Sequence, residues 1–152
     1  MCSHRTAARP GHIRIVLREK LQAGGQLSCW GWLGLAKQLT GCHDCPLHGC
    51  VVVPGEGPDK AALVVVGEAP GNTELRLKRP FVGPAGQLLD TVLHQAGIAR
   101  AQCYITNAVQ CMSWPTRTPK PDELKCCRQR LLSEVAARQP KVVLALGKVA
   151  MR

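Results

Sequence analysis

Three short apolar runs separated by helix-like segments limit the folds that are open to this chain. The runs are AALVVVGE at residues 61–68, CYITNAV at residues 103–109 and KVVLALG at residues 141–147. The first and third are almost continuously apolar, which is typical of strands covered on both faces of a parallel sheet. Strands that alternate with helices form parallel α/β sheets with right-handed crossovers. The order of these segments therefore predicts an α/β fold.

Two segments between the runs have the apolar spacing of amphipathic helices. The first spans residues 84–98, and its predicted apolar face holds Leu88, Leu89, Val92, Leu93 and Ala96, with Gly97 as the expected end. The second spans residues 121–139, and its apolar stripe holds Leu131, Leu132, Val135 and Ala136. Residues 12–23 are compatible with a third, short helix.

Length and charge restrict the number of domains and the kind of partner. The 152 residues suffice for one domain with a core but not for two. We expect a basic N-terminal extension at residues 1–40, partly helical or poorly ordered, and one domain at residues 41–152. The net charge of +10 favours a polyanionic partner such as nucleic acid. Because no membrane span and no secretory signal are evident, we expect a cytoplasmic monomer without membrane contact.

The loops that follow the first two predicted strands are the expected site, because ligands bind at the carboxyl ends of strands in such sheets. The first loop, GEAPG, lacks the ending of a phosphate-binding loop and the spacing of a dinucleotide site. Pro70 removes one amide donor, and Gly71 permits close approach of a ligand to the backbone. The loop is suited to hold a flat group beside Glu68, although a plain turn has a similar sequence.

An aromatic residue and an amide residue stand beside these loops. Phe81 is the only phenylalanine of the chain and lies in a Gly/Pro-rich turn before a predicted helix. It is either a core residue or a ring on which a base stacks. Asn107 lies late in the second predicted strand, where a buried amide requires hydrogen-bond partners. It either ties neighbouring loops together or binds the edge of a planar ligand at two points.

The segments GEAPGNTE, RPFVGPAGQLLD, YITNAVQC and TRTPKPDELKCC resemble the iron–sulfur uracil-DNA glycosylases, family 4 of that superfamily. The resemblance covers residues 41–147 and implies a three-layer α/β/α fold with a central parallel sheet. It also implies an enzyme that flips uracil out of DNA and hydrolyses its N-glycosidic bond in base excision repair. The family's second glutamate falls on Glu74, its stacking phenylalanine on Phe81 and its uracil-reading asparagine on Asn107.

The chemistry of uracil agrees with these roles. Stacking on an aromatic ring returns roughly 1–3 kcal/mol of the cost of extracting the base. The Asn107 carboxamide matches the N3–H donor and the O4 acceptor of uracil, both of which cytosine inverts. Amides of the EAPG loop, at Ala69 and Gly71, are expected to stabilise the uracil anion at O2. Glu68 is the candidate for placing the hydrolytic water, and Glu74 either assists it or excludes the thymine methyl group.

Four of the nine cysteines match the cluster ligands of the family. They are Cys42, Cys45, Cys111 and Cys127. Four such thiolates bind a 4Fe–4S cluster, whereas a CxxC motif alone is also consistent with zinc or redox chemistry. Cys126 is the rival for the fourth place, but adjacent helical positions point about 100° apart, so only one of the two faces the metal.

The resemblance ends before the last strand and the His-Pro-Ser loop of the family. We therefore expect a C-terminally incomplete domain in which one edge of the sheet is exposed. An alternative function follows, that of a catalytically impaired relative that binds a 4Fe–4S cluster and DNA. A small zinc- or redox-responsive protein that uses only Cys42 and Cys45 is a third hypothesis.

Overall fold

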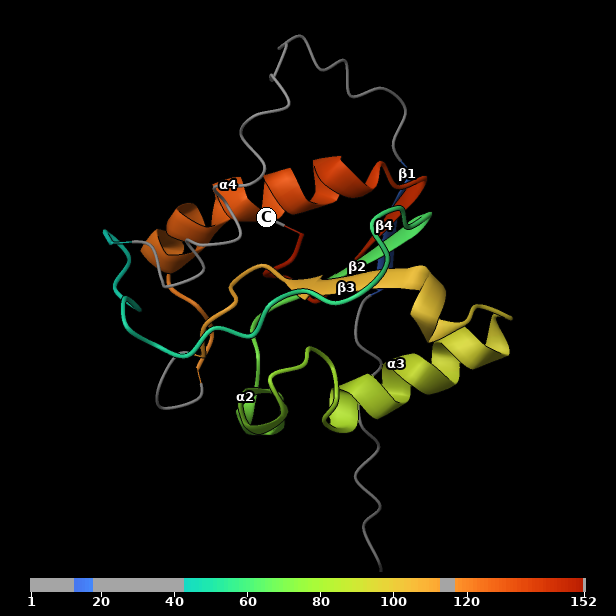
Figure 1. Cartoon of the computed structure of the whole chain (residues 1–152), viewed down its shortest axis with the longest axis horizontal. Coiled ribbons are helices and arrows are strands. Elements are labelled where there is room, and N and C mark those ends of the chain that lie inside the picture. The colour runs from blue at the N-terminus through green and yellow to red at the C-terminus, as the bar shows by residue number, and fades with distance from the viewer. Residues whose placement is uncertain (1–12, 18–42, 113–116, 152) are drawn as a thin grey trace, which may run out of the picture.

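The computed structural model describes residues 13–17, 43–112 and 117–151 (Figure 1). Within these residues, one sheet has the strand order β1-β4-β2-β3. The strands are β1 (Ile13–Leu17), β2 (Leu63–Gly67), β3 (Cys103–Asn107) and β4 (Val142–Leu146). β2 is parallel to both β3 and β4, whereas β1 is antiparallel to β4. The parallel part of the sheet confirms the α/β prediction.

Helices cover both faces of the sheet (Figure 1). They are α2 (Asn72–Leu77), α3 (Pro84–Gln95) and α4 (Pro121–Arg138), with a 3-10 turn at Arg100–Gln102 before β3. α4 lies on one face, and α2 and α3 lie on the other, which is the three-layer arrangement that the resemblance implies. None of the helices in the described part of the chain is long and apolar enough to cross a membrane.

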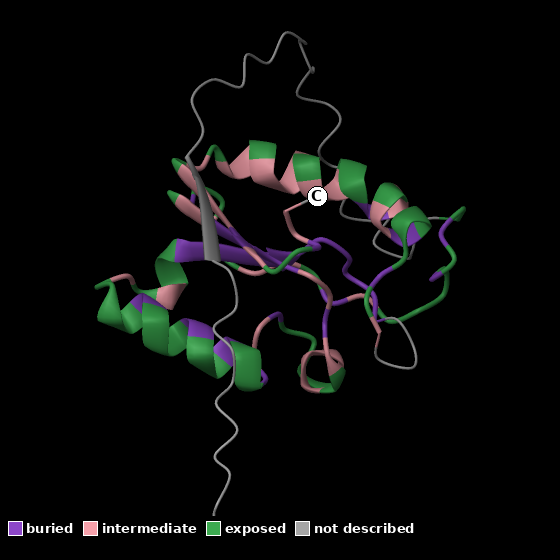
Figure 2. Ribbon diagram, turned by 180° about the vertical axis from the view of Figure 1, so that it is seen from behind, coloured by how far each residue is buried: buried purple, intermediate pink, exposed green. Residues whose placement is uncertain are grey.

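The side chains of β2 and β3 alternate between two hydrophobic clusters, one on each face of the sheet. The cluster on the α4 side contains Ala61, Val64, Val66 and Tyr104, with Leu131 and Val135 of α4 packed against it. The cluster on the α3 side contains Val65, Cys103, Ile105, Leu89 and Leu93. Figure 2 shows the central strands as the most buried part of the molecule. Burial on both faces accounts for the continuous apolar character of these strands.

β1 corrects two expectations. Residues 12–23 are compatible with a helix by sequence, but Ile13–Leu17 form a strand that starts with Ile13 opposite Leu146. The outer edge of β4, which was expected to be exposed, is therefore paired. An unpaired edge offers a row of free N–H and C=O groups, and a β-branched segment such as IRIVL is suited to bind them. Long-range pairing overrides the local helical signal here.

The buried faces of the helices are narrower than predicted. Leu89 and Leu93 of α3 are buried, whereas Leu88 is 66% exposed and Val92 is 41% exposed. On α4, Leu132 is 52% exposed. A helix that lies on a sheet buries only a stripe of its surface, and residues at the margin of that stripe remain in contact with water. The predicted apolar faces are therefore right for their central residues and wrong for those at the margin.

Candidate active site

The carboxyl ends of β2 and β3 bring the two predicted loops together. Gly67, the last residue of β2, pairs with Asn107, the last residue of β3. The pairing continues beyond the strands, because the Ala108 amide donates to the Gly67 carbonyl at 2.8 Å and the Val109 amide donates to the Glu68 carbonyl at 3.0 Å. The GEAPG and NAVQC segments therefore lie side by side.

Phe81 and Asn107 converge on Gly67 from two different segments. A side-chain carbon added at Gly67 would lie 2.5 Å from Asn107 Oδ1 and would collide with the Phe81 ring at Cζ and Cε2. The ring edge and the carboxamide are therefore neighbours, separated only by the space above a residue without a side chain. The structure brings together the two groups that the sequence singled out, in a slot formed by Phe81, Gly67 and Asn107.

The Asn107 main chain is fixed by a hydrogen bond, whereas its side-chain carboxamide is not. The residue is only 3% exposed, and Arg130 Nη2 donates to its carbonyl oxygen at 2.8 Å. Among the described residues, no hydrogen bond involves the Asn107 carboxamide. The Asn107 carboxamide is not among the fully buried polar groups without a partner, so its edge is accessible to the polar edge of a ligand.

Phe81 is half-buried and has an uncommon backbone conformation. Its φ of +53° lies in the left-handed region, which costs a bulky residue about 1–3 kcal/mol. Its side chain packs at the margin of the cluster that includes Val65 and Ile105. Its main chain lies against Gly86 in the first turn of α3, where an added side chain would collide with the Phe81 carbonyl. Phe81 therefore has both core contacts and an edge that faces the slot.

Glu74 of α2 binds main-chain amides on both sides of the site. Glu74 Oε2 accepts from the Gly71 amide at 3.1 Å. Glu74 Oε1 accepts from the amides of Val82 at 3.0 Å and Gly83 at 2.7 Å. One carboxylate thus ties the EAPG loop to the turn that follows Phe81. α2 itself has no counterpart among the predicted helices, because its six residues are too few to show a helical period.

A cleft of about 400 Å³ begins beside the slot. Its lining residues are Glu68, Ala69, Pro70, Gly71, Met112, Arg117 and Thr118. This volume lies in the usual range for small-molecule sites, roughly 300–1,000 Å³. Glu68 is half-buried there. The Gly71 amide is already bound to Glu74, whereas no hydrogen bond from the Ala69 amide is found among the described residues.

Arg117, which the sequence suggested as a phosphate contact, adds a positive charge to the cleft wall. Its Nη1 and Nη2 atoms donate to Glu123 at 3.0 and 2.6 Å. Glu123 is fully buried and also accepts from the Lys120 amide at 2.8 Å at the start of α4. The Glu123 carboxylate raises the pKa of Arg117. The cation is therefore fixed at the cleft wall by a buried partner.

A smaller hollow of about 270 Å³ lies away from these groups, beside Glu56, Arg79 and Arg100. Arg79 pairs with Glu56 at 2.6 Å, and Arg100 pairs with Asp90 at 2.7 Å. The hydrogen-bonded Arg79 guanidinium lowers the pKa of Glu56. The larger cleft is the better candidate for a ligand, because it is lined by the loop that follows β2.

Three of the four predicted cluster ligands lie in one buried group. Cys45, Cys111 and Cys127 form a hydrophobic cluster with Leu47 and Val109. Cys126 packs against this cluster from outside, and its Sγ lies 3.8 Å from the Asp44 carbonyl oxygen. Cys42 lies outside the described residues. No group of three or more His, Cys, Asp or Glu side chains within the described ranges is arranged to hold a metal ion.

The donor set nevertheless fits an iron–sulfur cluster in two respects. The three buried thiols come from a loop before β2, a loop after β3 and the first half of α4, segments that are far apart in the sequence. Thiolates in apolar surroundings are the usual ligands of such clusters. Cys127 is 7% exposed and belongs to the buried group, whereas Cys126 is at its margin, so the structure favours Cys127 over Cys126 as the inward-facing residue.

A family comparison agrees with this geometry. The family described as the Uracil DNA glycosylase superfamily matches residues 54–152. The chain belongs to the uracil DNA glycosylase superfamily. The match includes β2, β3, β4, the slot and the cleft, so the parts of the chain that build the candidate site are those shared with the superfamily.

Individual relatives in the superfamily point to the same group. The chain is 39% identical over 120 residues to the type-4 uracil-DNA glycosylase of Pyrobaculum aerophilum, covering 78% of this chain and 61% of that protein. It is 41% identical over 119 residues to the type-4 enzyme of Thermotoga maritima, covering 77% and 62%. A type-5 uracil-DNA glycosylase of Thermus thermophilus is 33% identical over 114 residues, covering 65% and 52%. The chain thus spans about three fifths of the length of its type-4 relatives.

Proposed function

We propose that this chain is a uracil-DNA glycosylase, which takes uracil out of DNA and hydrolyses its N-glycosidic bond in base excision repair. The observation that carries the proposal is the convergence of the Phe81 ring and the Asn107 carboxamide on Gly67. Membership of the superfamily and the similarity to type-4 uracil-DNA glycosylases support it.

The slot supplies the interactions that select uracil. The base stacks on the Phe81 ring, which returns roughly 1–3 kcal/mol of the cost of unstacking it. The Asn107 amide N–H donates to O4, and its oxygen accepts from N3–H. In cytosine the donor and acceptor at these positions are exchanged, so both contacts with the Asn107 carboxamide are lost. Unpaired polar groups in such a site discriminate strongly between the two bases.

Groups of the adjoining cleft assist the cleavage. Cleavage of the glycosidic bond leaves an oxocarbenium-like sugar and a uracil anion. The Ala69 amide is the donor for the developing charge at O2, because the Gly71 amide is bound to Glu74. Glu68 lines the cleft and orients the water that attacks the sugar. Glu74 acts as a positioning residue, because its carboxylate binds three main-chain amides around the site.

The proposed cofactor is a 4Fe–4S cluster held by Cys42, Cys45, Cys111 and Cys127. The burial of the last three in one cluster supports this set. When bound, the cluster supplies a structural crosslink. These residues join the loop before β2 to the loop after β3 and to α4. Glu123 of α4 also accepts a hydrogen bond from Arg117 at the cleft wall.

The proposed partner is uracil-containing DNA, bound by a monomer in the cytoplasm. The net charge of +10 suits a polyanion. Arg117 at the cleft wall is positioned to meet a phosphate or the departing base.

Release of uracil from a single-stranded oligonucleotide by the purified chain tests the proposal. We expect uracil release from an oligonucleotide with one deoxyuridine and none from the same sequence with thymidine. Replacement of Asn107 with Asp should lower the single-turnover rate by about 100-fold or more, because a carboxylate has no donor for O4 and repels it. The matched control is Gln95→Glu at the exposed end of α3. Equal rates for Asn107→Asp and the unmodified chain would refute the assignment.

A further inference from the structure

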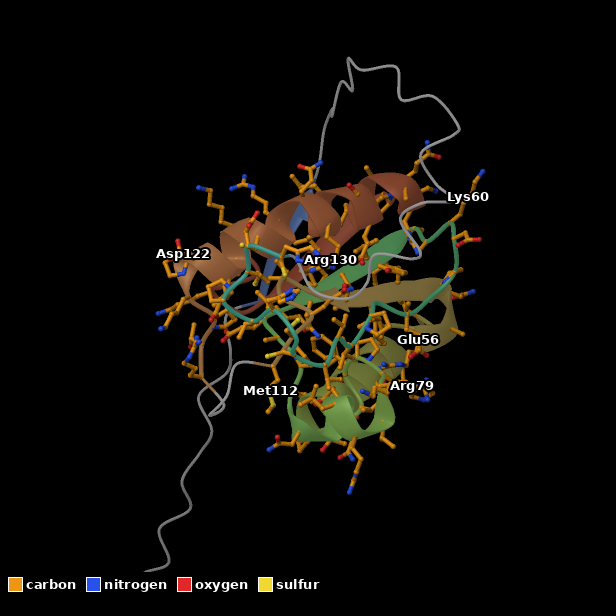
Figure 3. The ribbon with its side chains drawn as sticks, turned by 60° about the vertical axis from the view of Figure 1, so that its left-hand side comes forward. Glu56, Lys60, Arg79, Met112, Asp122 and Arg130 are labelled. Atoms are coloured by element: carbon orange, nitrogen blue, oxygen red, sulfur yellow. The ribbon has the colours of Figure 1, made fainter. Side chains whose placement is uncertain are left out.

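An ion pair on α4 binds the main chain of β3 at the point where it leaves the sheet. Arg130 and Glu134 lie one helical turn apart, with Arg130 Nη1 2.8 Å from Glu134 Oε2. Arg130 Nη2 donates to the carbonyl oxygens of Asn107 at 2.8 Å and Ala108 at 3.0 Å. Figure 3 shows Arg130 between α4 and the sheet. One guanidinium therefore holds the peptide groups on the carboxyl side of the residue proposed to read uracil.

Glu134 binds the same segment of β3 on either side of these carbonyls. Its Oε2 accepts from Thr106 Oγ1 at 3.0 Å, and its Oε1 accepts from Gln110 Nε2 at 2.9 Å. Thr106 is 0% exposed and Gln110 is 3% exposed. The pair thus contacts the residues on both sides of Asn107 and the Asn107 carbonyl, and the Asn107 side chain itself is not used.

The position of β3 in the sheet explains why this contact is needed. β3 is the last strand in the order β1-β4-β2-β3, and on its outer edge Ile105 pairs with Glu56. Beyond Ile105, the carbonyls of residues 107 and 108 require other partners, because a buried carbonyl without a hydrogen bond destabilises the fold. Arg130 provides both hydrogen bonds. A shift of the backbone at residues 107–108, which would carry the Asn107 side chain with it, breaks them.

We propose that the Arg130–Glu134 pair is the positioning device of the uracil-reading residue: it fixes the direction of the Asn107 carboxamide and thereby the preference for uracil. This inference rests on the proposed function, since it assigns a cause to the orientation of a residue in the slot. Arg130 and Glu134 do not contact the base. Arginine is required at this position because its planar fork reaches two carbonyls and a carboxylate at once, whereas a lysine amine is a single point charge.

A double-mutant cycle separates positioning from general stability. We expect Arg130→Met to lower the single-turnover rate of uracil release by about 10-fold to 100-fold, which is typical of a displacement near 1 Å at a reacting group. Arg130→Lys should recover part of the rate. In an Asn107→Ala background the same change should have almost no further effect, because the residue being positioned is gone. Lys141→Met, at the amino end of β4, is the charge-matched control and should keep the normal rate.

Additive losses of Arg130→Met and Asn107→Ala would overturn the proposal. So would a loss that appears only as weaker binding of the oligonucleotide, since that result identifies Arg130 as a phosphate contact. If Arg130→Met does not fold, as judged by its thermal unfolding, the comparison is made with Arg130→Lys and Glu134→Gln.

Hydrogen exchange gives a readout that does not depend on activity. The Ala108 and Val109 amides donate to the carbonyls of Gly67 and Glu68, so their exchange reports the order of this segment. We expect faster exchange at both amides in Arg130→Lys, while exchange in β2 stays unchanged. Unchanged exchange at Ala108 and Val109 would overturn the positioning role even if the chain releases uracil. Absence of uracil release by the unmodified chain would instead refute the proposed function, and the exchange comparison would still decide the role of the pair.

Discussion

Replacement of Gly67 with alanine tests the geometry of the slot most directly. The added methyl group would lie 2.5 Å from Asn107 Oδ1 and 2.6 Å from Phe81 Cε2. Ordinary contacts of such a carbon begin near 3.4 Å. The ring and the carboxamide must therefore each move away by about 1 Å, or the strand must shift, because the packed core leaves no other space. The substitution perturbs both recognition groups without changing either one.

The expected effect on activity is larger than the effect on stability. A displacement of about 1 Å at a substrate-positioning group lowers the rate by about 100-fold. Overpacking costs about 1–3 kcal/mol, and the lower entropy of the unfolded chain offsets about 0.4–1 kcal/mol of this. The free energy of unfolding should therefore fall by about 1–2 kcal/mol, which leaves a domain of ordinary stability folded at 25 °C.

The assay compares Gly67→Ala with a glycine variant outside the site. Single-turnover release of uracil is measured beside chemical denaturation of the same preparation. Gly97→Ala is the control: Gly97 has a φ of +70° and no atom within 4 Å of an added side chain. Alanine there costs about 1 kcal/mol through its left-handed backbone, with no contact to the slot. It should lose stability and keep its activity.

A folded Gly67→Ala protein that releases uracil at the normal rate would show that the rate does not depend on the positions of Phe81 and Asn107. Equal losses of activity in the Gly67→Ala and Gly97→Ala proteins would show that the rate reports stability rather than the slot. Either result would remove the observation on which the proposed function depends.

Two further predictions concern the core and the cysteines. Burial raises the pKa of Tyr104 to about 12, so the free energy of unfolding should fall by about 2–3 kcal/mol as the pH rises from 10 to 12, where only the unfolded chain loses its proton. Denaturation at several pH values checks this, and Tyr104→Phe should reduce the fall by about 2–3 kcal/mol. Cys127→Ser should reduce the iron content and visible absorbance of protein purified without oxygen, whereas Cys50→Ser, at an exposed position, should not. Equal iron in both variants would contradict the ligand assignment.

Local apolar patterns predicted the main elements well. The runs at residues 61–68, 103–109 and 141–147 contain β2, β3 and β4, and the two predicted helices begin at the same residues as α3 and α4. Buried strands and helices have a strong apolar signal because their buried positions recur at a regular spacing along the sequence. α2 was not predicted, because a six-residue helix is too short to show this regular spacing. The predicted helix faces were wrong at their margins, where the spacing does not decide whether a residue is buried.

The sequence by itself determined the α/β order of the chain and two of the three residues of the slot. Phe81 and Asn107 were identifiable because loops at the carboxyl ends of parallel strands meet at one edge of the sheet. Their convergence on Gly67 follows from that topology together with the parallel pairing of Gly67 and Asn107.

Only the tertiary structure decided how these groups are held. The Arg130–Glu134 pair behind Asn107 and the pairing of β1 with β4 join segments that are distant in the sequence, and the three amides bound by Glu74 depend on how the chain turns between residues 71 and 83. A hydrogen bond depends on the direction of two groups to within a few tens of degrees, and no local pattern of residues specifies that direction. Apolar burial is non-directional and proportional to area, so it leaves a pattern in the sequence that hydrogen bonds do not.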